Sequence, residues 1–321
     1  MSANTQCDHL DTLISEQFGV VSRTQLLTLG MTDKAVEHRI RPGGPWQVML
    51  PGVYLTETGT PSLLHKEMAA ALYAGSGSVI TGSAAMFHYG LRPPRLDMID
   101  VLIPGERRRR SISFVQVERT LRMPLRVSTR GPLQFALVAR AVMDTSRTLR
   151  NVREVRAVIA DAMQQGHCTL RQLGEELGEG PIRHSALPRR VLGEVRQGIR
   201  STVEGDLLDL IKGAHLPMPM LNPDLYLGKQ FIARPDAWWP DAAVAVEVDS
   251  REWHLSPAAW EKTMARHDLM FSLGIYPLHF SPRQLHQEPT TVIKRIRDTY
   301  QRGLERGPLP IRTVPCPNRA G

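Results

Sequence analysis

Three carboxylates near the C-terminus have the spacing of a metal site. Ten residues separate Asp236 from Glu247 and include a Pro-Asp turn, so strands over residues 230–239 and 244–249 would form a β-hairpin that brings the two acids side by side. Asp249 shares a face with Glu247, because alternate residues of a strand point the same way. Converging carboxylates repel unless a cation neutralises them, and oxygen ligands suit Mg²⁺ or Mn²⁺. The hairpin therefore predicts a divalent-metal site.

An ion held at these acids would activate water and stabilise charge on a phosphodiester, so the predicted chemistry is phosphodiester hydrolysis. His254, five residues beyond Asp249, is a candidate general base, and Arg266 is a candidate for stabilising the transition state. Plainer alternatives exist, since acidic strand ends are often only solvated and a lone histidine after a strand usually packs or caps. Glu247 favours ligation, because an unpaired charge within an apolar strand is costly.

Pro235-Asp236, ten residues and then Glu247-Val248-Asp249 resemble the motif of the PD-(D/E)XK nucleases. The resemblance implies a restriction-endonuclease-like α/β/α domain over residues 201–305, in which the three acids of the motif are catalytic metal-site residues. It also implies a further metal-site acid on a helix before the hairpin. Glu204, in STVEGDLLDLI, is well placed for that role.

A closer likeness is to the very-short-patch-repair-like branch, which reads E-x-D-G-x-x-W-H and then, on a helix, R-x-D-x-x-L-x-x-x-G. Glu247, Asp249, His254 and Arg266 occupy matching positions here. Asp249 departs from the general motif, because most of these nucleases carry the catalytic lysine at that position. Water activation must then fall to another residue.

The first 58 residues predict a winged helix-turn-helix. Three helices are expected, over residues 8–17, 22–29 and 33–40. Ser22 and Thr32 are the N-caps of the second and third helices, and a hairpin over residues 46–55 forms the wing. The exposed side of the third helix predicts DNA binding by Lys34, His38, Arg39 and Arg41. The alternative is a three-helix unit that packs on its neighbour.

This segment, GVVSRTQLLTLGMTDKAVEHRIRPGGPWQVMLPGVYL, resembles the N-terminal winged-helix domain of the AbiEi-type antitoxins of type IV toxin–antitoxin systems. With VITGSAAMFHYGLRPP included, the similarity covers roughly residues 10–95. The resemblance implies a fold and a partner toxin more than an activity, because this domain is attached to many different C-terminal halves.

Residues 59–200 are expected to form an α+β middle region. Strands over residues 98–103 and 112–117 flank PGERRRR, which predicts a hairpin with four arginines at its tip. That tip could lie along a phosphate backbone or enter a minor groove, and a solvated loop is the alternative. The four residues are Arg107, Arg108, Arg109 and Arg110.

Composition limits the partners and the compartment. A formal net charge of +8 and a pI near 9.7 indicate nucleic acid as the first partner, although a merely basic protein would look the same. The three cysteines are scattered without CxxC spacing, which predicts neither a disulfide framework nor a cysteine-based zinc site. The chain has no run of eighteen apolar residues and no secretory signal, which predicts a cytoplasmic protein without a membrane partner.

Together these features predict a mixed α/β protein that acts as a metal-dependent DNA nuclease, directed by a winged helix, in defence or DNA repair. The alternative is a non-catalytic DNA-binding regulator, or type IV antitoxin-like protein, with a degenerate nuclease fold. The missing lysine favours the alternative, the three acids favour the nuclease, and RNA hydrolysis is a third option. The sequence leaves the oligomeric state open, homo-oligomers included, and its proline-rich residues 306–321 predict a disordered tail.

Overall fold

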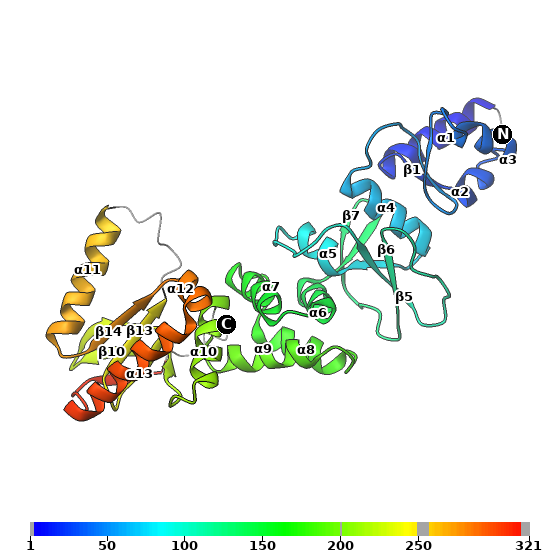
Figure 1. Cartoon of the computed structure of the whole chain (residues 1–321). Coiled ribbons are helices and arrows are strands. Elements are labelled where there is room, and N and C mark those ends of the chain that lie inside the picture. Colours follow the sequence, from blue (N-terminus) through cyan, green and yellow to red (C-terminus); the bar gives the residue numbers. More distant parts are fainter. Residues whose placement is uncertain (1–2, 200, 249–256, 316–321) are drawn as a thin grey trace. The chain divides into compact units, whose positions relative to one another are not determined.

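The computed structural model describes residues 3–199, 201–248 and 257–315. These residues form thirteen helices and fifteen strands, which is the mixed α/β composition that the sequence predicts. They divide into a first unit, Met1–Arg150 with Asp161–Pro188, and a second unit, Asn151–Ala160 with Arg189–Gly321 (Figure 1). The predicted boundaries near residues 58, 200 and 305 are finer than this division and stay predictions. Among the described helices, none is long and apolar enough to span a bilayer.

The N-terminal part of the first unit contains the three helices and the hairpin that the sequence predicts, together with one further strand. The elements are α1 (Ala3–Glu16), β1 (Val20–Ser22), α2 (Arg23–Thr28), α3 (Asp33–Ile40), β2 (Gln47–Leu50) and β3 (Val53–Leu55). Ser22 and Thr32 cap α2 and α3 by accepting hydrogen bonds from the backbone N–H groups of Gln25 and Ala35, as predicted. The additional strand β1 pairs with β3 and places Val21 in the core.

The rest of the first unit is built on a five-stranded mixed sheet of order β6-β5-β4-β8-β7. Its strands are β4 (Val79–Thr81), β5 (Ile99–Pro104), β6 (Val115–Thr120), β7 (Val127–Arg130) and β8 (Leu133–Ala136). The accompanying helices include α4 (Leu63–Ala74), α5 (Gly82–His88), α6 (Val138–Thr148) and α8 (Leu170–Glu179). Asp144 on α6 is buried and accepts hydrogen bonds from Arg140, Arg147 and Thr81, so this interior carries a paired charge cluster.

The predicted hairpin around the arginine run is wrong. Strands β5 and β6 are parallel, with Ile99 opposite Val115, so the arginines lie in a connection that returns the chain to the starting end of β5. The alternation of residue types marks the strands but not their relative direction, and a tight turn can join only antiparallel strands. The four arginines therefore do not form a hairpin tip.

The second unit is built on a four-stranded sheet of order β14-β13-β12-β9, beside a three-stranded sheet of order β11-β10-β15. The strands are β9 (Met220–Leu221), β10 (Asp224–Leu227), β11 (Gln230–Ala233), β12 (Ala237–Trp239), β13 (Val244–Val248), β14 (Tyr276–Phe280) and β15 (Arg312–Val314). The helices are α9 (Ala186–Arg196), α10 (Thr202–Gly213), α11 (Pro257–Ser272), α12 (Pro282–Gln287), α13 (Pro289–Arg306) and the first part of α7 (Val152–Gln164). β13 runs parallel to β14 and antiparallel to β12.

Adjacent tryptophans mark the two faces of the main sheet. Trp239 packs with residues of α10, α12 and α13 on one face. Trp238 packs on the other face with Met270 of α11 and with residues of the smaller sheet, including Leu225 and Ile232. The main sheet is therefore covered by helices on one side and by a helix with a small sheet on the other.

Two further expectations for this unit are wrong. The strand predicted over residues 230–239 is interrupted at Pro235, which lacks an N–H for a sheet ladder, so β11 and β12 belong to different sheets. The tail predicted to be disordered from residue 306 contains β15, which pairs with β10. Leu309 and Ile311 pack against the core beside it, and their burial outweighs the proline-rich composition.

Candidate active site

The hairpin of β12 and β13 brings two of the predicted acids together. Ala237 lies opposite Val246 in the antiparallel register, so the next pair outward is Asp236 and Glu247. Oδ2 of Asp236 accepts a hydrogen bond of 2.7 Å from the backbone N–H of Val248, which holds the carboxylate against the end of β13. The Pro-Asp junction thus places its acid at the open edge of the hairpin rather than inside a strand.

Glu204 reaches the same region from helix α10. The hydroxyl of Ser201, which caps α10, donates to one oxygen of Glu204 at 3.0 Å, and Nδ2 of Asn222 donates to the other at 2.7 Å. The backbone N–H of Asn222 also donates to the carbonyl of Asp236. Asn222, which the sequence reading missed, therefore ties the helical acid to the hairpin acid; its left-handed backbone, with φ of 49°, suits asparagine.

The pKa of Asp236 depends on its burial and on the acids close to it. Burial is the largest cause that raises the pKa of Asp236 to about 7, and the nearby carboxylates of Glu204 and Glu247 contribute to the rise, against the lowering effects of the Val248 N–H and of Arg266. The pocket therefore disfavours a full set of negative charges. A cation that neutralised them would relieve the repulsion.

Arg266 and two histidines surround Glu247 on its other side. The guanidinium of Arg266, on α11, donates to Oε2 of Glu247 at 2.7 Å. His279 lies opposite Glu247 in the parallel pairing of β13 with β14, and the ring of His267 on α11 lies 3.7 Å from the ring of His279 between centroids. One ligand atom from each of Glu247, His267 and His279 lies within 4.8 Å of the others.

Sequence reasoning assigned Arg266 to this site but missed both histidines. One signal was available for His279, which is a polar residue in a short, mostly apolar strand that follows a helix. A strand–helix–strand connection commonly returns parallel to the first strand, which would have set His279 beside Glu247. His267 carried a weaker signal, because only the orientation of α11 distinguishes it from a solvated helical residue. Asp249 and His254 lie outside the described residues.

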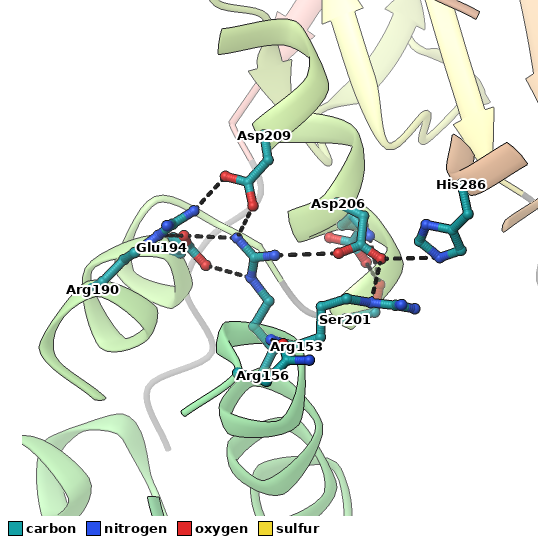
Figure 2. Close-up of polar contacts among 10 residues, drawn as sticks. Arg153, Arg156, Arg190, Glu194, Ser201, Asp206, Asp209 and His286 are labelled. Carbon is teal, nitrogen blue, oxygen red and sulfur yellow. Dashed lines mark hydrogen bonds and ion pairs between the residues drawn. The ribbon is translucent and has the colours of Figure 1, made fainter. Parts of the chain in front are cut away.

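An arginine network holds the opposite face of α10 (Figure 2). The side chain of Arg156 on α7 is only 2% exposed and donates to Glu194 on α9 at 2.8 and 2.9 Å. It also donates to Asp206 at 3.3 Å and to Asp209 at 2.8 Å, both on α10. Three helices are thereby joined at one guanidinium, which fixes the helix that presents Glu204.

Further charged groups complete this network at its edge. Arg190 donates to Glu194 and Asp209, Arg153 lies 3.1 Å from Asp206, and His286 of α12 lies 3.5 Å from the same carboxylate. The network belongs to the second unit alone, and it positions the acid site without contributing a ligand to it.

Comparison with known proteins gives relatives but no activity. No family model matches the chain. Two proteins from two strains of Mycobacterium tuberculosis, both named only as uncharacterized proteins, are each 26% identical to the chain over 267 residues, which is 83% of this chain and 96% of each relative. The matched length exceeds that of either unit, so the similarity extends over residues of both.

The predicted DNA-contacting residues of α3 differ in their availability. Lys34, His38 and Arg41 are exposed, at intervals that put them on one side of the helix and its C-cap. Arg39 instead donates to the carbonyl of Ala35 and lies over the ring of Trp46, so its guanidinium already has partners within the unit. Lys34, His38 and Arg41 are therefore the predicted residues whose side chains are available to DNA.

The arginine run divides in the same way. Arg107 donates to the carbonyls of Ala74 and Ser76 at the C-terminal end of α4, where a cation stabilises the helix. Arg109 lies over the ring of Tyr73 and is exposed, as are Arg108 and Arg110. Arg107 is therefore a structural residue in this unit, and the other three stay candidates for phosphate contacts.

The donor set at the hairpin fits a hard divalent cation. Glu204, Asp236 and Glu247 offer only oxygen atoms, which Mg²⁺ and Mn²⁺ prefer, and the acids next to Asp236 contribute to its raised pKa after burial. Asp236 and Glu247 are the residues best placed to hold such an ion. Glu204 is linked to Asp236 through Asn222, which donates one hydrogen bond to each of the two residues.

Proposed function

We propose that the protein is a metal-dependent DNA nuclease whose acid site is formed by Asp236, Glu247 and Glu204. The single observation that carries the proposal is the register of the β12–β13 hairpin, which sets Asp236 beside Glu247, with Glu204 linked to Asp236 through Asn222. A structural charge cluster is normally balanced by its own partners, as the Arg156 network is. Half-buried carboxylates that meet at the ends of two adjacent strands favour a cation-binding role.

Each residue has a role in this proposal. Asp236 and Glu247 hold the divalent ion, and Glu204 orients the metal-site groups through Asn222. When bound, the ion lowers the pKa of water and stabilises charge on the scissile phosphate. Arg266 supplies positive charge beside Glu247 for the phosphate oxygens. Asp249 and His254 keep the roles of third acid and general base that the sequence assigns to them.

The first unit would bring the nuclease to DNA. Its exposed Lys34, His38 and Arg41 support binding of the phosphate backbone, as does the net charge of +8 of the whole chain. Phosphate contacts give affinity and register without reading sequence, so these residues support DNA binding but leave the recognised sequence open.

One observation favours the second candidate, a DNA-binding regulator with an inactive nuclease fold. Arg266 already pairs with Glu247 at 2.7 Å, and this ion pair neutralises part of the charge that a metal would neutralise. In a regulator, that pair would be a permanent part of the fold. In a nuclease, the metal and Arg266 would share the carboxylate.

The test is cleavage of supercoiled plasmid by the full-length protein with EDTA, Mg²⁺, Mn²⁺ or Ca²⁺. We expect nicking with Mg²⁺ or Mn²⁺ and little with Ca²⁺, which is larger and a poorer activator of water. Asp236→Asn and Glu247→Gln should abolish nicking, while Asp298→Asn, at an exposed acid of α13, should cut as the wild type does.

DNA affinity, followed by fluorescence anisotropy, separates the two candidates. The nuclease proposal predicts that both site variants still bind DNA, because the phosphate contacts lie elsewhere in the chain. If the wild type binds DNA but leaves duplex, single-stranded and mismatched substrates intact with either metal, the nuclease proposal fails and the regulator takes its place.

A further inference from the structure

The side of Glu247 that faces away from Asp236 carries a different set of donors. Glu247 comes from β13, His279 from the adjacent parallel strand β14, and His267 from α11, which packs on the sheet. Their three donor atoms lie within 4.8 Å of one another, and all three side chains are half-buried. Three separate elements therefore converge on one small volume with two nitrogen donors and one oxygen donor.

We propose that Glu247, His267 and His279 form a binding site for a transition-metal ion, with Zn²⁺ or Mn²⁺ as the chemical class of ligand. Imidazole nitrogen is a common ligand of zinc and other first-row transition ions, whereas Mg²⁺ takes oxygen ligands almost exclusively. The donor set thus selects against Mg²⁺, which the acids around Asp236 suit. Two histidines and one carboxylate also leave coordination positions open, as catalytic zinc sites do.

The geometry needs only local adjustment to close around an ion. Ligand atoms of tetrahedral zinc lie about 3.3 Å apart, given zinc–nitrogen bonds of about 2.0 Å. Side-chain rotation can bring atoms that already lie within 4.8 Å to that spacing, since the ring of His267 stands on a helix surface and can turn about its side-chain torsions. The backbone positions of Glu247 and His279 are fixed by the parallel ladder.

The two imidazoles lie against each other and beside the carboxylate. Their centroids lie 3.7 Å apart with the rings tilted by 36°. Nδ1 of His279 lies 3.9 Å from Oε2 of Glu247. An ion bound by all three side chains would require the two rings to separate from this contact, which rotation of the His267 side chain allows.

Arg266 would compete with the ion for Glu247. Its guanidinium holds Oε2 of that carboxylate, so an ion must share Glu247 with Arg266 or displace it. Removal of the guanidinium should therefore tighten metal binding. This inference goes beyond the nuclease proposal, because it concerns an ion whose binding does not require cleavage, although the two sites share Glu247.

Calorimetric titration of the chelator-treated, full-length protein tests the site with Zn²⁺, Mn²⁺ and Mg²⁺ separately. We expect one Zn²⁺ per chain at this site, and loss of affinity of at least about tenfold in His267→Gln and in His279→Gln, since even partners of metal ligands contribute 10–100-fold. The matched control is His215→Asn, at an exposed histidine whose φ of 54° suits asparagine. Arg266→Gln should bind Zn²⁺ more tightly than the wild type.

Visible absorption of the Co²⁺-loaded protein provides a second measurement. The spectrum of a low-coordinate Co²⁺ site should be present in the wild type and in His215→Asn and lost in His267→Gln. Circular dichroism of each variant establishes that it is folded; if His279→Gln does not fold, His267→Gln, outside the strand, still decides the question. Zn²⁺ binding that is unchanged in a folded His267→Gln protein, or absent from the wild type, would overturn the proposal.

The same variants keep this inference separate from the nuclease proposal. Zn²⁺ binding is measured without DNA, so its loss in His267→Gln is judged independently of cleavage. Wild-type protein that binds Zn²⁺ through the histidines and nicks DNA with Mg²⁺ supports both proposals, whereas Zn²⁺ binding by a protein that never cleaves DNA supports the transition-metal site alone.

Discussion

The two sides of helix α10 carry buried charge in opposite ways. Asp206 and Asp209 meet Arg156, whose guanidinium is paired with acids on two helices (Figure 2). Glu204 instead belongs to the neighbourhood of Asp236, where acids outnumber cations. An α-helix turns about 100° per residue, so Asp206 and Asp209 lie about 200° and 140° around the axis from Glu204. One helix therefore separates a balanced cluster from an unbalanced one.

The pKa values of one acid from each cluster show the difference. Burial alone would raise the pKa of Glu194, but the hydrogen bonds from Arg156 and Arg190 outweigh burial and lower it. Burial, with a smaller contribution from acidic neighbours, raises the pKa of Asp236 to about 7. Burial also raises the pKa of Asp206, which belongs to the Arg156 network, so the contrast lies in the partners of each acid and not in the direction of every shift. Under our proposal, a bound cation would supply the Asp236 cluster with the partner that the arginines supply to the Arg156 network.

The largest effect is expected when the balanced cluster loses its cation. Arg156→Met leaves the buried Glu194 and Asp206 and the half-buried Asp209 without their shared partner. Breaking a buried ion pair on one side costs about 3–5 kcal/mol of the free energy of unfolding. Urea unfolding followed by tryptophan fluorescence measures this loss, because Trp238 and Trp239 are buried in the same unit.

Arg190→Met is the matched control for that variant. Arg190 shares Glu194 and Asp209 with Arg156 but is 46% exposed, so its removal should cost no more than about 1 kcal/mol. Equal losses in the two variants would show that burial does not distinguish the two arginines, and the comparison of the clusters would then fail.

The stability that Asp236 contributes should change with pH in the opposite direction from that of a carboxylate in an ordinary ion pair. The pKa of Asp236 is raised in the folded protein from 3.8 to about 7, so the folded state binds more protons than the unfolded state between about pH 4 and 7. Stability from this group therefore falls as the pH rises through that window. Asp236→Asn removes the charge, and at pH 8 it should be more stable than the wild type by about 2–4 kcal/mol.

The contrasting variant is Glu194→Gln on the other side of α10. Its carboxylate is stabilised by arginines, so its neutralisation should destabilise the protein at pH 8. Mg²⁺ or Mn²⁺ should raise the melting temperature of the wild type at pH 8 but not that of Asp236→Asn, because a ligand stabilises only the state that binds it. Asp236→Asn that is less stable than the wild type at pH 8 contradicts the assignment of an unbalanced site.

Sequence reasoning reached the acid site because its determinants are local. The alternation of apolar residues in VAVEV and the ten-residue interval to Asp236 define a hairpin, and a hairpin fixes which residues lie opposite each other. Helix caps were predictable for the same reason, since Ser22 and Thr32 act on residues three positions away.

What the sequence did not reveal depends on tertiary packing. The direction of β6 relative to β5 is set by the connection and the sheet, not by the residues of either strand. His279 meets Glu247 only because β14 returns parallel to β13, and Arg156 meets Asp209 across more than fifty positions of the chain. No short-range pattern predicts such a pairing, so the histidines and the arginine network become visible only in three dimensions.

The smallest effect, and the finest test of how tightly the balanced cluster is packed, comes from two glycines of α10. A Cβ atom at Gly205 would overlap Nε, Cζ and Cδ of Arg156, whereas one at Gly213 would meet nothing within 4 Å. Neither glycine has a positive φ, so alanine suits the backbone at both positions. Only the contact with Arg156 distinguishes the two substitutions.

Gly213→Ala should stabilise the protein by about 0.5 kcal/mol, because alanine loses less backbone entropy than glycine on folding. Gly205→Ala should gain the same backbone-entropy stabilisation but lose about 1–3 kcal/mol of the free energy of unfolding. The loss arises because Arg156 is paired with acids on two helices and cannot move aside without breaking an ion pair. The measurement is the difference between the two variants in urea. If Gly205→Ala is as stable as Gly213→Ala, the guanidinium of Arg156 has room to shift. That result would contradict the tight packing of Arg156 in this network. In the double variant Gly205→Ala, Arg156→Ala all three overlapping atoms are absent. Relative to Arg156→Ala alone, the added cost of the alanine at position 205 should disappear, and this coupling separates a clash with Arg156 from a general defect of the helix.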